Sequence, residues 1–512
     1  MMNKFNTFFC VLFLTISSSS IGQVPSFVSD SLDSFMQREM ARWQIPGAAV
    51  AIVKDGKILV SKGYGVADIQ TGKPVDASTL FMVASNSKAF TGTAIAMLEE
   101  EGKLNLDDPV RQYLPWLDLY DDCATEMVTI KDMLTHRIGL QTFQGDFLHW
   151  GSDLSRKELL ERMDVHEPQY NFRDGYGYCN MGFVAAGEII PEVTGKSWDD
   201  YIAQEIFRPL KMNRSSTTYS ALLKDKNACI GYTLHDGELV VEPYENIDNL
   251  GPAASINSCV DDLAQWVMMN SQEGRMGNQQ LFSEDVIARA TTPYNLVGET
   301  RGGLYDKQHF ELYGLGWFMA DYNGKKMVWH DGGANGFVTT TCFLPELDLG
   351  IVVLTNTDAN WFYEALKMQI IESWLDMPYR NISATYYGFF ENRQEQEAKE
   401  TAMLYAKARG GGAVASLPLK AYTGNYRSSV YGMINISEVD GKLRVTFEHH
   451  PDLYGELEPL GENEEFVCTY NQIIYGVKKV RFKVEDGKVV KYQMQVADFI
   501  DRMRYTFDRI TK

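Results

Sequence analysis

Ser85-Asn86-Ser87-Lys88 are the four most informative consecutive residues of this 512-residue chain. They open a segment, residues 85–101, whose composition predicts a helix that ends at Gly102. Residues three apart share one face of a helix, so the Lys88 amine can reach the Ser85 hydroxyl. A serine hydroxyl becomes a good nucleophile only when a neighbouring base takes its proton. A lysine can be that base if burial or a nearby cation lowers its pKa.

This pattern has a second interpretation, because two fixed residue types at one spacing arise by chance on the order of once in a chain of this length. Ser85 and Lys88 would then be ordinary polar residues of a first helical turn. A helix N-terminus also offers free N–H groups and a positive field to a developing oxyanion, which favours the catalytic interpretation. Further motifs are needed to choose between the two.

Tyr178-Cys179-Asn180 supplies a second set of reactive groups. A phenol beside a lysine amine can pass protons, and an amide two residues away can hold a substrate carbonyl. Tyr244-Glu245-Asn246 has the same spacing, but it follows Pro243 in a polar, turn-like stretch. Tyr178 instead directly precedes an apolar segment, residues 183–190, that is typical of a helix. A rigid support of this kind favours Tyr178 over Tyr244.

His330-Asp331-Gly332-Gly333 is the third motif. Two glycines let a backbone approach a substrate closely and present its N–H groups. His235-Asp236-Gly237 has the same three letters, but it lies between two strand-like runs, where Asp-Gly is typical of a hairpin turn. The sequence therefore favours the His330 copy.

The order of the motifs resembles a known family. S-x-x-K, Y-x-N and H-x-G, separated by about 90 and about 150 residues, are similar to the motifs of the serine β-lactamase and penicillin-binding-protein superfamily, in its class C and esterase-like branch. The resemblance extends over roughly residues 26–378. Four further stretches resemble the family: Ile45-Pro46-Gly47-Ala48-Ala49-Val50, Met133-Leu134-Thr135-His136-Arg137-Ile138-Gly139-Leu140, Phe207-Arg208-Pro209-Leu210-Lys211-Met212 and Asp262-Leu263-Ala264-Gln265-Trp266.

The resemblance implies an α/β (α+β) fold. Its parts would be a five-stranded antiparallel sheet flanked by helices and an all-helical lobe, with the nucleophile at the seam. The implied reaction is acyl transfer through a covalent serine intermediate. Carried over motif by motif, the site residues are Ser85 as the acylated nucleophile, Lys88 and Tyr178 as the shared general base, Asn180, His330 and Gly332 as substrate-binding residues, and the backbone N–H groups of Ser85 and Gly333 as the oxyanion hole.

The third motif departs from the family pattern. Penicillin-recognising members carry K-T-G, whose lysine attracts a substrate carboxylate, and His330 takes that place here. A histidine with an ordinary pKa is mostly neutral at pH 7. Esterases and D-amino-acid peptidases that resemble this superfamily often carry H-x-G, so we expect ester or peptide hydrolysis more than β-lactam cleavage. A weakly catalytic penicillin- or peptidoglycan-binding protein or sensor is the alternative, and a scaffold with a vestigial site is a third.

The length and composition of the chain predict several units. We expect a hydrolase domain over residues 23–380, a helical and glycine-rich linker over residues 381–414, and a small antiparallel β-barrel or sandwich over residues 415–512. Strand-like runs recur in the last unit, with hairpin turns at Asp440-Gly441 and Asp486-Gly487. From Leu419-Lys420-Ala421-Tyr422-Thr423-Gly424-Asn425-Tyr426 onward, it resembles the lipocalin-like β-domain appended to hydrolases of this family.

The N-terminus is typical of a signal peptide over residues 1–22. Lys4 provides a positive start, residues 8–16 are apolar but too short to span a bilayer, and small residues follow. The expected location is therefore secreted or periplasmic, without stable membrane insertion. A formal net charge of −20 argues against a nucleic-acid partner.

No spacing of cysteine or histidine predicts a metal site, and no cofactor is expected. Six cysteines follow the signal segment, and most are expected to be buried free thiols. The expected partner is a small-molecule or peptide substrate, and no pattern indicates an oligomeric state. One cluster keeps two interpretations, a substrate pocket or plain core: Phe143, Phe147, Trp150, Tyr170, Phe172 and Tyr176.

Overall fold

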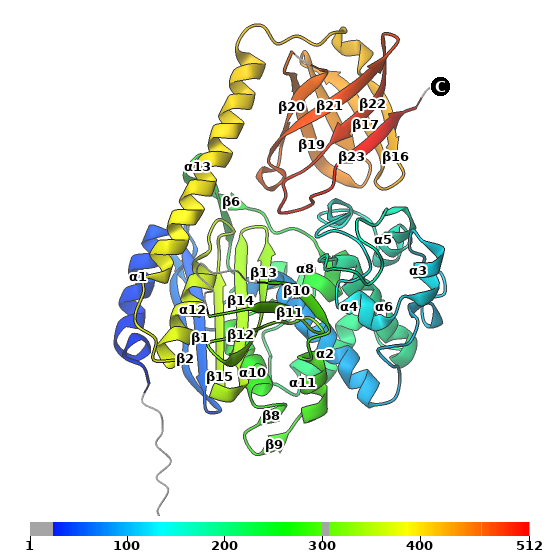
Figure 1. The fold of residues 1–512 in the computed structure, drawn as a ribbon. Coiled ribbons are helices and arrows are strands. Elements are labelled where there is room, and N and C mark those ends of the chain that lie inside the picture. Colours follow the sequence, from blue (N-terminus) through cyan, green and yellow to red (C-terminus); the bar gives the residue numbers. More distant parts are fainter. Residues whose placement is uncertain (1–23, 300–306, 462, 511–512) are drawn as a thin grey trace, which may run out of the picture.

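The computed structural model describes residues 24–299, 307–461 and 463–510. Figure 1 shows a sheet with covering helices, a helical lobe beside it, a long helix and a small barrel above the lobe. The expected signal peptide, residues 1–22, lies outside the described residues. Within the described ranges, no helix combines the length and apolar character needed to cross a membrane.

The main sheet is antiparallel throughout and has nine strands, whereas the expectation was five. The additional strands lie towards the two edges, where polar residues interrupt the alternation that marks a strand in sequence. In sheet order the strands are β10 (Asn295–Glu299), β11 (Phe310–Tyr313), β12 (Phe318–Tyr322), β13 (Lys325–Ala334), β14 (Phe337–Leu344), β15 (Leu349–Thr355), β1 (Gly47–Lys54), β2 (Lys57–Asp68) and β3 (Lys73–Pro74).

Helices cover both faces of the sheet, which is why β1 and β15 are nearly continuous apolar runs. Val50 and Ile52 of β1 belong to the core that includes α1 (Leu32–Arg42) and α12 (Phe362–Trp374). Ala49 and Ala51 face the opposite way, into the core shared with α10 (Val260–Ser271) and the helical lobe. Because successive side chains of a strand point to opposite faces, β1 contributes residues to both hydrophobic cores of the domain.

The helical lobe packs around α2 (Ser87–Glu100), which is buried along most of its length. Figure 1 shows α2 between the sheet and the rest of the lobe, so its first turn lies at the expected seam. The other helices of this region are α3 (Asp122–Met127), α4 (Ile130–Leu134), α5 (Arg156–Leu160), α6 (Asn180–Thr194), α7 (Trp198–Tyr201), α8 (Tyr219–Lys224), α9 (Gly251–Ala254) and α11 (Glu284–Ala290).

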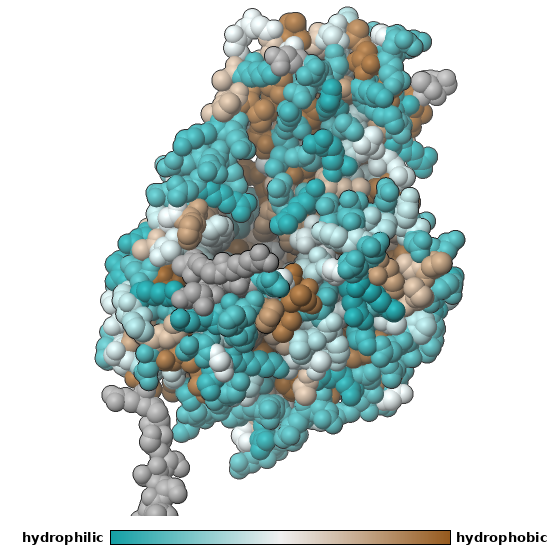
Figure 2. Space-filling model, viewed as in Figure 1, coloured by the Kyte–Doolittle hydropathy of each residue, from teal (hydrophilic) through white to brown (hydrophobic). Residues whose placement is uncertain are grey.

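The long helix α13 (Ile382–Arg409) connects the sheet domain to the barrel. It lies within the linker expected over residues 381–414, and the Asn381 side chain caps its start by accepting from the Ala384 N–H at 3.1 Å. Its buried residues all lie in its first three turns. The remainder is hydrophilic on the face shown in Figure 2 and carries ion pairs four residues apart, such as Arg393 with Glu397.

The C-terminal unit is a closed eight-stranded antiparallel barrel, one of the two architectures expected. Pairing of its first and last strands closes it. Asp440 and Asp486 lie in hairpin turns with positive φ, as the Asp-Gly pairs predicted. The strands are β16 (Gly424–Ser428), β17 (Gly432–Val439), β18 (Lys442–Phe447), β19 (His450–Pro459), β20 (Glu465–Tyr470), β21 (Val477–Glu485), β22 (Lys488–Met494) and β23 (Tyr505–Arg509).

Phe147 joins the helical lobe to the barrel. Its ring stacks on His450 at 4.5 Å and on Tyr431 at 5.0 Å between ring centroids, so a lobe side chain lies inside the aromatic core of the barrel. His450 Nε2 donates to the Trp150 carbonyl at 2.8 Å, and the Phe147 N–H donates to the Asp501 carboxylate at 3.1 Å. The barrel is therefore docked by both packing and backbone hydrogen bonds on residues 147–150.

The cysteines of the described residues are all free thiols. Cys123 is exposed, and the others are buried, which confirms the expectation for most of them. The buried cysteines are Cys179, Cys229, Cys259, Cys342 and Cys468.

Candidate active site

Ser85 lies in a tight turn before α2. Ala84, directly before it, has a φ of +46°, a left-handed value that costs a residue with a β-carbon about 1 to 2 kcal/mol. Buried Asn86 holds the turn: its amide nitrogen donates to Thr339 Oγ1 at 2.9 Å, and its oxygen accepts from Thr341 Oγ1 at 2.6 Å. Both threonines belong to β14, so the sheet fixes the position of the turn that holds Ser85.

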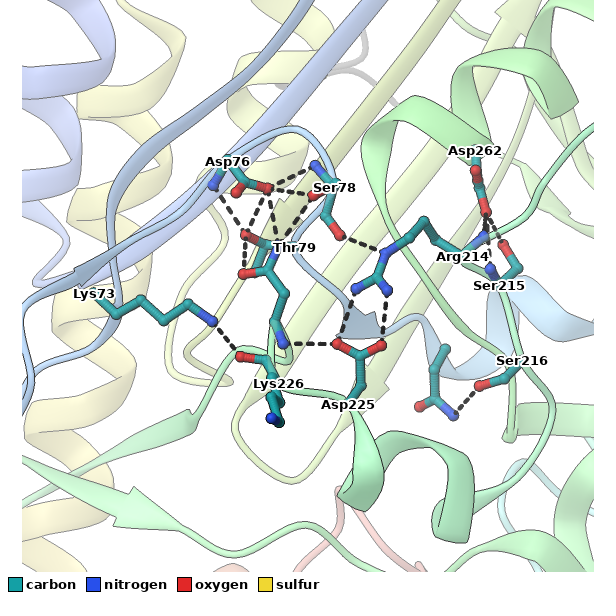
Figure 3. Close-up of polar contacts among 12 residues, drawn as sticks. Lys73, Asp76, Ser78, Thr79, Arg214, Ser215, Ser216, Asp225, Lys226 and Asp262 are labelled. Carbon is teal, nitrogen blue, oxygen red and sulfur yellow. Dashed lines mark hydrogen bonds and ion pairs between the residues drawn. The ribbon is translucent and has the colours of Figure 1, made fainter.

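A polar network holds the chain segment that leads to this turn (Figure 3). The Arg214 guanidinium donates a two-pronged pair of hydrogen bonds to Asp225, at 2.8 and 2.9 Å, and a third to the Ser78 carbonyl at 3.3 Å. Asp262 accepts from the Arg214 and Ser215 N–H groups, each at 2.8 Å. These bonds tie the approach to β4 (Phe81–Met82) to the loop before α8, so the turn that holds Ser85 has a fixed support on this side as well.

Lys88 is fully buried beneath Ser85. Its Nζ lies 3.1 Å from Ser85 Oγ, 2.6 Å from Asn180 Oδ1 and 3.0 Å from the Ala253 carbonyl oxygen. A neutral amine has two N–H donors, and the Asn180 and Ala253 oxygens accept them. The nitrogen lone pair is then free to accept the Ser85 hydroxyl proton.

The environment of Lys88 favours this neutral form. Burial lowers the pKa of Lys88 to about 7, although the nearby Asp146 and Cys179 oppose the shift. A substantial fraction of the amine is therefore deprotonated at neutral pH. A base with a pKa near the working pH is the most effective in proton transfer.

Tyr178 is buried beside the amine, with its ring centroid 4.6 Å from Lys88 Nζ. Burial raises the pKa of Tyr178 well above its usual value, although a hydrogen bond with Ser85 opposes the rise. The phenol therefore keeps its proton at neutral pH. The ring lies 4.4 Å from the ring of His136, whose Nδ1 accepts from the Cys179 N–H at 2.9 Å. His136 thus supports Tyr178 structurally.

Asn180 is the first residue of α6, and protein groups engage both ends of its amide. Its oxygen accepts from Lys88, and its nitrogen donates to Asp146 Oδ2 at 2.5 Å. Asn180 lines the cavity described below, and a role in orienting the substrate stays a prediction. Its hydrogen bonds to Lys88 and Asp146 instead hold the lysine amine in place.

The backbone at Gly332 passes close to the turn that holds Ser85. A β-carbon on Gly332 would lie 2.1 Å from the Val83 carbonyl oxygen, so no larger residue fits without moving the strand. This is the close backbone approach that the glycine pair indicated. Gly333 follows in β13, opposite Val338 of β14, and lines the same cavity as Ser85.

His330 is buried and neutral. Burial, aided by the charge of Lys88, lowers the pKa of His330 to about 3. Its Nδ1 lies 2.6 Å from the Asp331 carbonyl oxygen, which can only accept, so Nδ1 carries the proton. Nε2 then accepts from the Tyr313 hydroxyl at 3.1 Å. Both ring nitrogens are occupied, and His330 offers no positive charge to a substrate carboxylate.

One cavity of about 480 Å³ collects these groups. Of the residues expected from the motifs, all except the buried Lys88 line it: Ser85, Tyr178, Asn180, His330, Gly332 and Gly333. The structure thus brings the three motifs together around one space, although about 90 and about 150 residues separate them in the chain.

The aromatic cluster that kept two interpretations is divided by the structure. Phe143, Trp150 and Tyr176 line the cavity of Ser85. Phe147 belongs to the barrel core instead. Tyr170 and Phe172 line a separate cavity of about 290 Å³.

The two rival motifs lie elsewhere. Tyr244 donates its hydroxyl to the Cys229 carbonyl at 2.7 Å and is not part of the cavity wall. His235-Asp236-Gly237 forms the hairpin turn between β5 (Gly231–His235) and β6 (Glu238–Glu242), as its Asp-Gly pair indicated.

Four residues of the site were not singled out from the sequence. Asp146 had a weak signal, as the lone acid in an aromatic stretch, and Tyr313 had none. Phe499 and Arg502 reach the cavity from the barrel, more than 300 residues after the motif of Tyr178, and no local pattern marks them.

Comparisons with known proteins agree with this architecture. A family model described as Beta-lactamase matches residues 32–373, and one described as a domain of unknown function matches residues 408–509. Protein flp of Staphylococcus aureus (strain NCTC 8325 / PS 47) is 29% identical over 355 residues, covering 66% of this chain and 66% of that protein. The chain therefore spans slightly less than two thirds of the length of that relative.

Two further relatives cover more of the chain. Unguisins hydrolase ungD' of Aspergillus campestris (strain IBT 28561) is 28% identical over 424 residues, covering 78% of this chain and 76% of that protein. The solved structure of the octameric penicillin-binding protein homologue from Pyrococcus abyssi matches with a TM-score of 0.59 and 24% identity, covering 93% of this chain and 99% of that chain. The likeness to this structure shows a common fold.

The family match, the shared fold and the convergence of the three motifs are consistent with one another and support one family assignment. Because the Beta-lactamase model covers well over half of its residues, this chain belongs to the beta-lactamase family, and it carries an additional C-terminal eight-stranded barrel.

Proposed function

We propose that the protein is a serine hydrolase that works through an acyl-enzyme on Ser85. The observation that carries this proposal is the contact of 3.1 Å between Ser85 Oγ and the buried Lys88 amine, whose pKa is lowered to about 7. A nucleophile and a base within hydrogen-bonding reach are the signature of nucleophilic catalysis. Membership of the family and a relative named as a hydrolase support the same conclusion.

Acylation begins when the Lys88 amine takes the proton of Ser85 and Oγ attacks the substrate carbonyl carbon. The carbonyl oxygen becomes an oxyanion, and the N–H groups of Ser85 and Gly333 would stabilise it. As the bond to the leaving group breaks, the Tyr178 phenol gives its proton to the leaving group. The Lys88 ammonium then returns a proton to Tyr178, which leaves the acyl-enzyme.

In deacylation, water is the nucleophile and Lys88 is again the base. A water molecule gives its proton to the neutral Lys88 amine as its oxygen attacks the acyl carbon. The tetrahedral intermediate collapses, the bond to Ser85 Oγ breaks, and the ammonium returns the proton to that oxygen. The free enzyme and a carboxylic acid result.

Ester or amide bonds, including D-peptides, are the proposed targets, in preference to β-lactams. His330 stands where penicillin-recognising relatives have a cation, and it is neutral with both nitrogens occupied. The His330 position therefore offers no positive charge to the carboxylate of a β-lactam. We further propose that the protein is exported to a secreted or periplasmic location and acts on small-molecule or peptide substrates.

A small substrate panel tests the proposal: a p-nitrophenyl ester, a D-amino-acid amide, a D-Ala-D-Ala peptide and a chromogenic cephalosporin. We expect turnover of an ester, amide or peptide to exceed that of the cephalosporin, and to disappear in Ser85→Ala. Unchanged turnover in Ser85→Ala would overturn the proposal. Binding of a penicillin without turnover of any substrate would instead favour the penicillin- or peptidoglycan-binding alternative.

A further inference from the structure

The barrel contributes part of the cavity wall. Phe499, Ile500 and Arg502 lie between β22 and β23 and line the cavity together with Ser85. The Phe499 ring covers the oxyanion-hole strand, because a β-carbon on Gly333 would lie 3.1 Å from its Cε2 atom. Access to the nucleophile is therefore shaped by a domain other than the one that holds it.

This barrel segment is firmly held. The Asp501 carboxylate is buried and accepts three hydrogen bonds: from the Phe147 N–H at 3.1 Å, from the Tyr505 hydroxyl at 2.5 Å and from the Met503 N–H at 2.7 Å. The first of these comes from the helical lobe, and the other two come from the barrel. The backbone at Arg502, next to Asp501 in the chain, is thereby held beside the cavity.

Arg502 itself is exposed to the cavity. Its guanidinium carbon lies 5.5 Å from the centre of the Phe143 ring, and Phe143 packs edge-on against Tyr178 at 5.5 Å. Among the described residues, no carboxylate forms an ion pair with Arg502. Its five N–H donors, arranged to fit a carboxylate, therefore remain available to a ligand.

The acidic side chains of the cavity have protein partners or are partly protonated, and Asp146 Oδ2 accepts from Asn180 Nδ2 at 2.5 Å. Asp331 faces the buried Lys367 amine at 3.6 Å. Burial raises the pKa of Asp358 to about 6 and that of Glu311 to about 7, so each is partly protonated near neutral pH. Of the cavity-lining residues, Arg502 is the one that presents a permanent positive charge.

We propose that Arg502 recognises a carboxylate, or a comparable anionic group, on the substrate. This inference rests on the proposed function and narrows it to acidic esters, amides or peptides. Arg502 would supply, from the barrel and on the Tyr178 side of the cavity, the charge that neutral His330 does not supply from β13. The barrel then takes part in choosing the substrate.

Two matched ligand pairs test this inference. Phenylboronic acid and 3-carboxyphenylboronic acid add reversibly to a serine oxygen, and their binding is measured as protection of Ser85 from a fluorophosphonate probe. The second pair is phenyl phenylacetate and 3-carboxyphenyl phenylacetate, in which the carboxylate lies on the leaving group. Their kcat/KM values are compared. We expect the carboxylate to be favoured in at least one pair, and Arg502→Gln to reduce that preference about 10-fold or more, as for a charge-assisted hydrogen bond.

Arg504→Gln is the matched control, because Arg504 is an exposed arginine of the same segment that does not line the cavity. It should leave the preference unchanged, Arg502→Lys should retain part of it, and added salt should weaken it. A preference that is absent in both pairs, or unchanged in Arg502→Gln, would overturn the role of Arg502. Probe labelling of Ser85 in every variant keeps this outcome separate from failure of the proposed function.

Discussion

Asp146 Oδ2 accepts a hydrogen bond of 2.5 Å from Asn180 Nδ2, and the oxygen of the same amide accepts from Lys88 at 2.6 Å. One side chain therefore separates a buried carboxylate from the amine that faces the nucleophile. The negative charge of Asp146 raises the pKa of Lys88, against the larger lowering by burial. The pKa of Lys88 thus depends on these two opposing effects, and removing the Asp146 charge should lower it.

The pH dependence of acylation follows from the pKa of Lys88. Only the neutral amine can take the proton of Ser85, so the rate should rise with pH and reach half its plateau at about pH 7. The measurement is the rate of fluorophosphonate labelling from about pH 5 to about pH 9. A rate that is still rising steeply at the upper end, towards the ordinary lysine value of 10.5, would contradict the assignment.

Asp146→Asn should move this midpoint to lower pH. The substitution removes the charge that raises the pKa of Lys88, whereas the asparagine oxygen can still accept from Asn180. The same pH series of labelling rates measures the shift. Asp164→Asn is the control, because Asp164 is exposed and outside the cavity, and its midpoint should match that of the wild type. A shift of the midpoint to higher pH in Asp146→Asn would contradict the conclusion that the Asp146 charge raises the pKa of Lys88.

Gly332→Ala should lower acylation about 10²-fold. The added β-carbon would lie 2.1 Å from the Val83 carbonyl oxygen, so β13 must move away from the turn that holds Ser85, and small displacements at a reacting centre are costly. Gly298→Ala in β10 is the matched control, since a β-carbon there meets nothing within 4 Å. The measurement compares the fluorophosphonate labelling rates of Gly332→Ala and Gly298→Ala, and thermal unfolding checks that both variants are folded. Equal rates would mean that β13 does not border the reacting groups.

Phe147→Ala should loosen the docking of the barrel. Removing a buried phenylalanine costs about 3 to 5 kcal/mol, and here the lost contacts include His450 and Tyr431 across the interface. Hydrogen exchange of residues 497–503 should rise, because Asp501 is anchored by the Phe147 N–H. Phe389→Ala, which truncates an exposed ring of α13, should leave that exchange unchanged. Unchanged protection in Phe147→Ala would indicate that the barrel is held by other contacts.

The residues that converge on the Ser85 cavity could be picked out from the sequence because each lies in a short motif beside a recognisable element. Ser85 and Lys88 share one helix face, Tyr178 precedes α6, and the glycines after His330 allow a close backbone approach. Even so, each motif was weak alone, and the rivals at Tyr244 and His235 were set aside by their turn-like surroundings. The sheet and the helical lobe were implied by the resemblance of these motifs to a known family, and the barrel was predicted from strand-like runs with Asp-Gly turns.

Contacts between distant segments could not be predicted in this way. Asp146 acts through the Asn180 side chain, and the Tyr313 hydroxyl donates to His330 Nε2 from another strand. Arg502 reaches the cavity only because Phe147 docks the barrel. The strand number was also wrong, because the edge strands lack the alternation that marks a strand in sequence. Such features depend on tertiary packing, which one sequence does not display.

Mapping of the covalent adduct tests the central claim most directly. The protein is treated with a fluorophosphonate, digested, and its peptides are analysed by mass spectrometry, in parallel with Ser85→Ala and Lys88→Met and with Lys57→Met as an exposed control. The account predicts one adduct, on Ser85, that is absent from Ser85→Ala, forms about 10² times more slowly in Lys88→Met and forms at the wild-type rate in Lys57→Met. An adduct on another residue, or an undiminished rate in folded Lys88→Met, would contradict it.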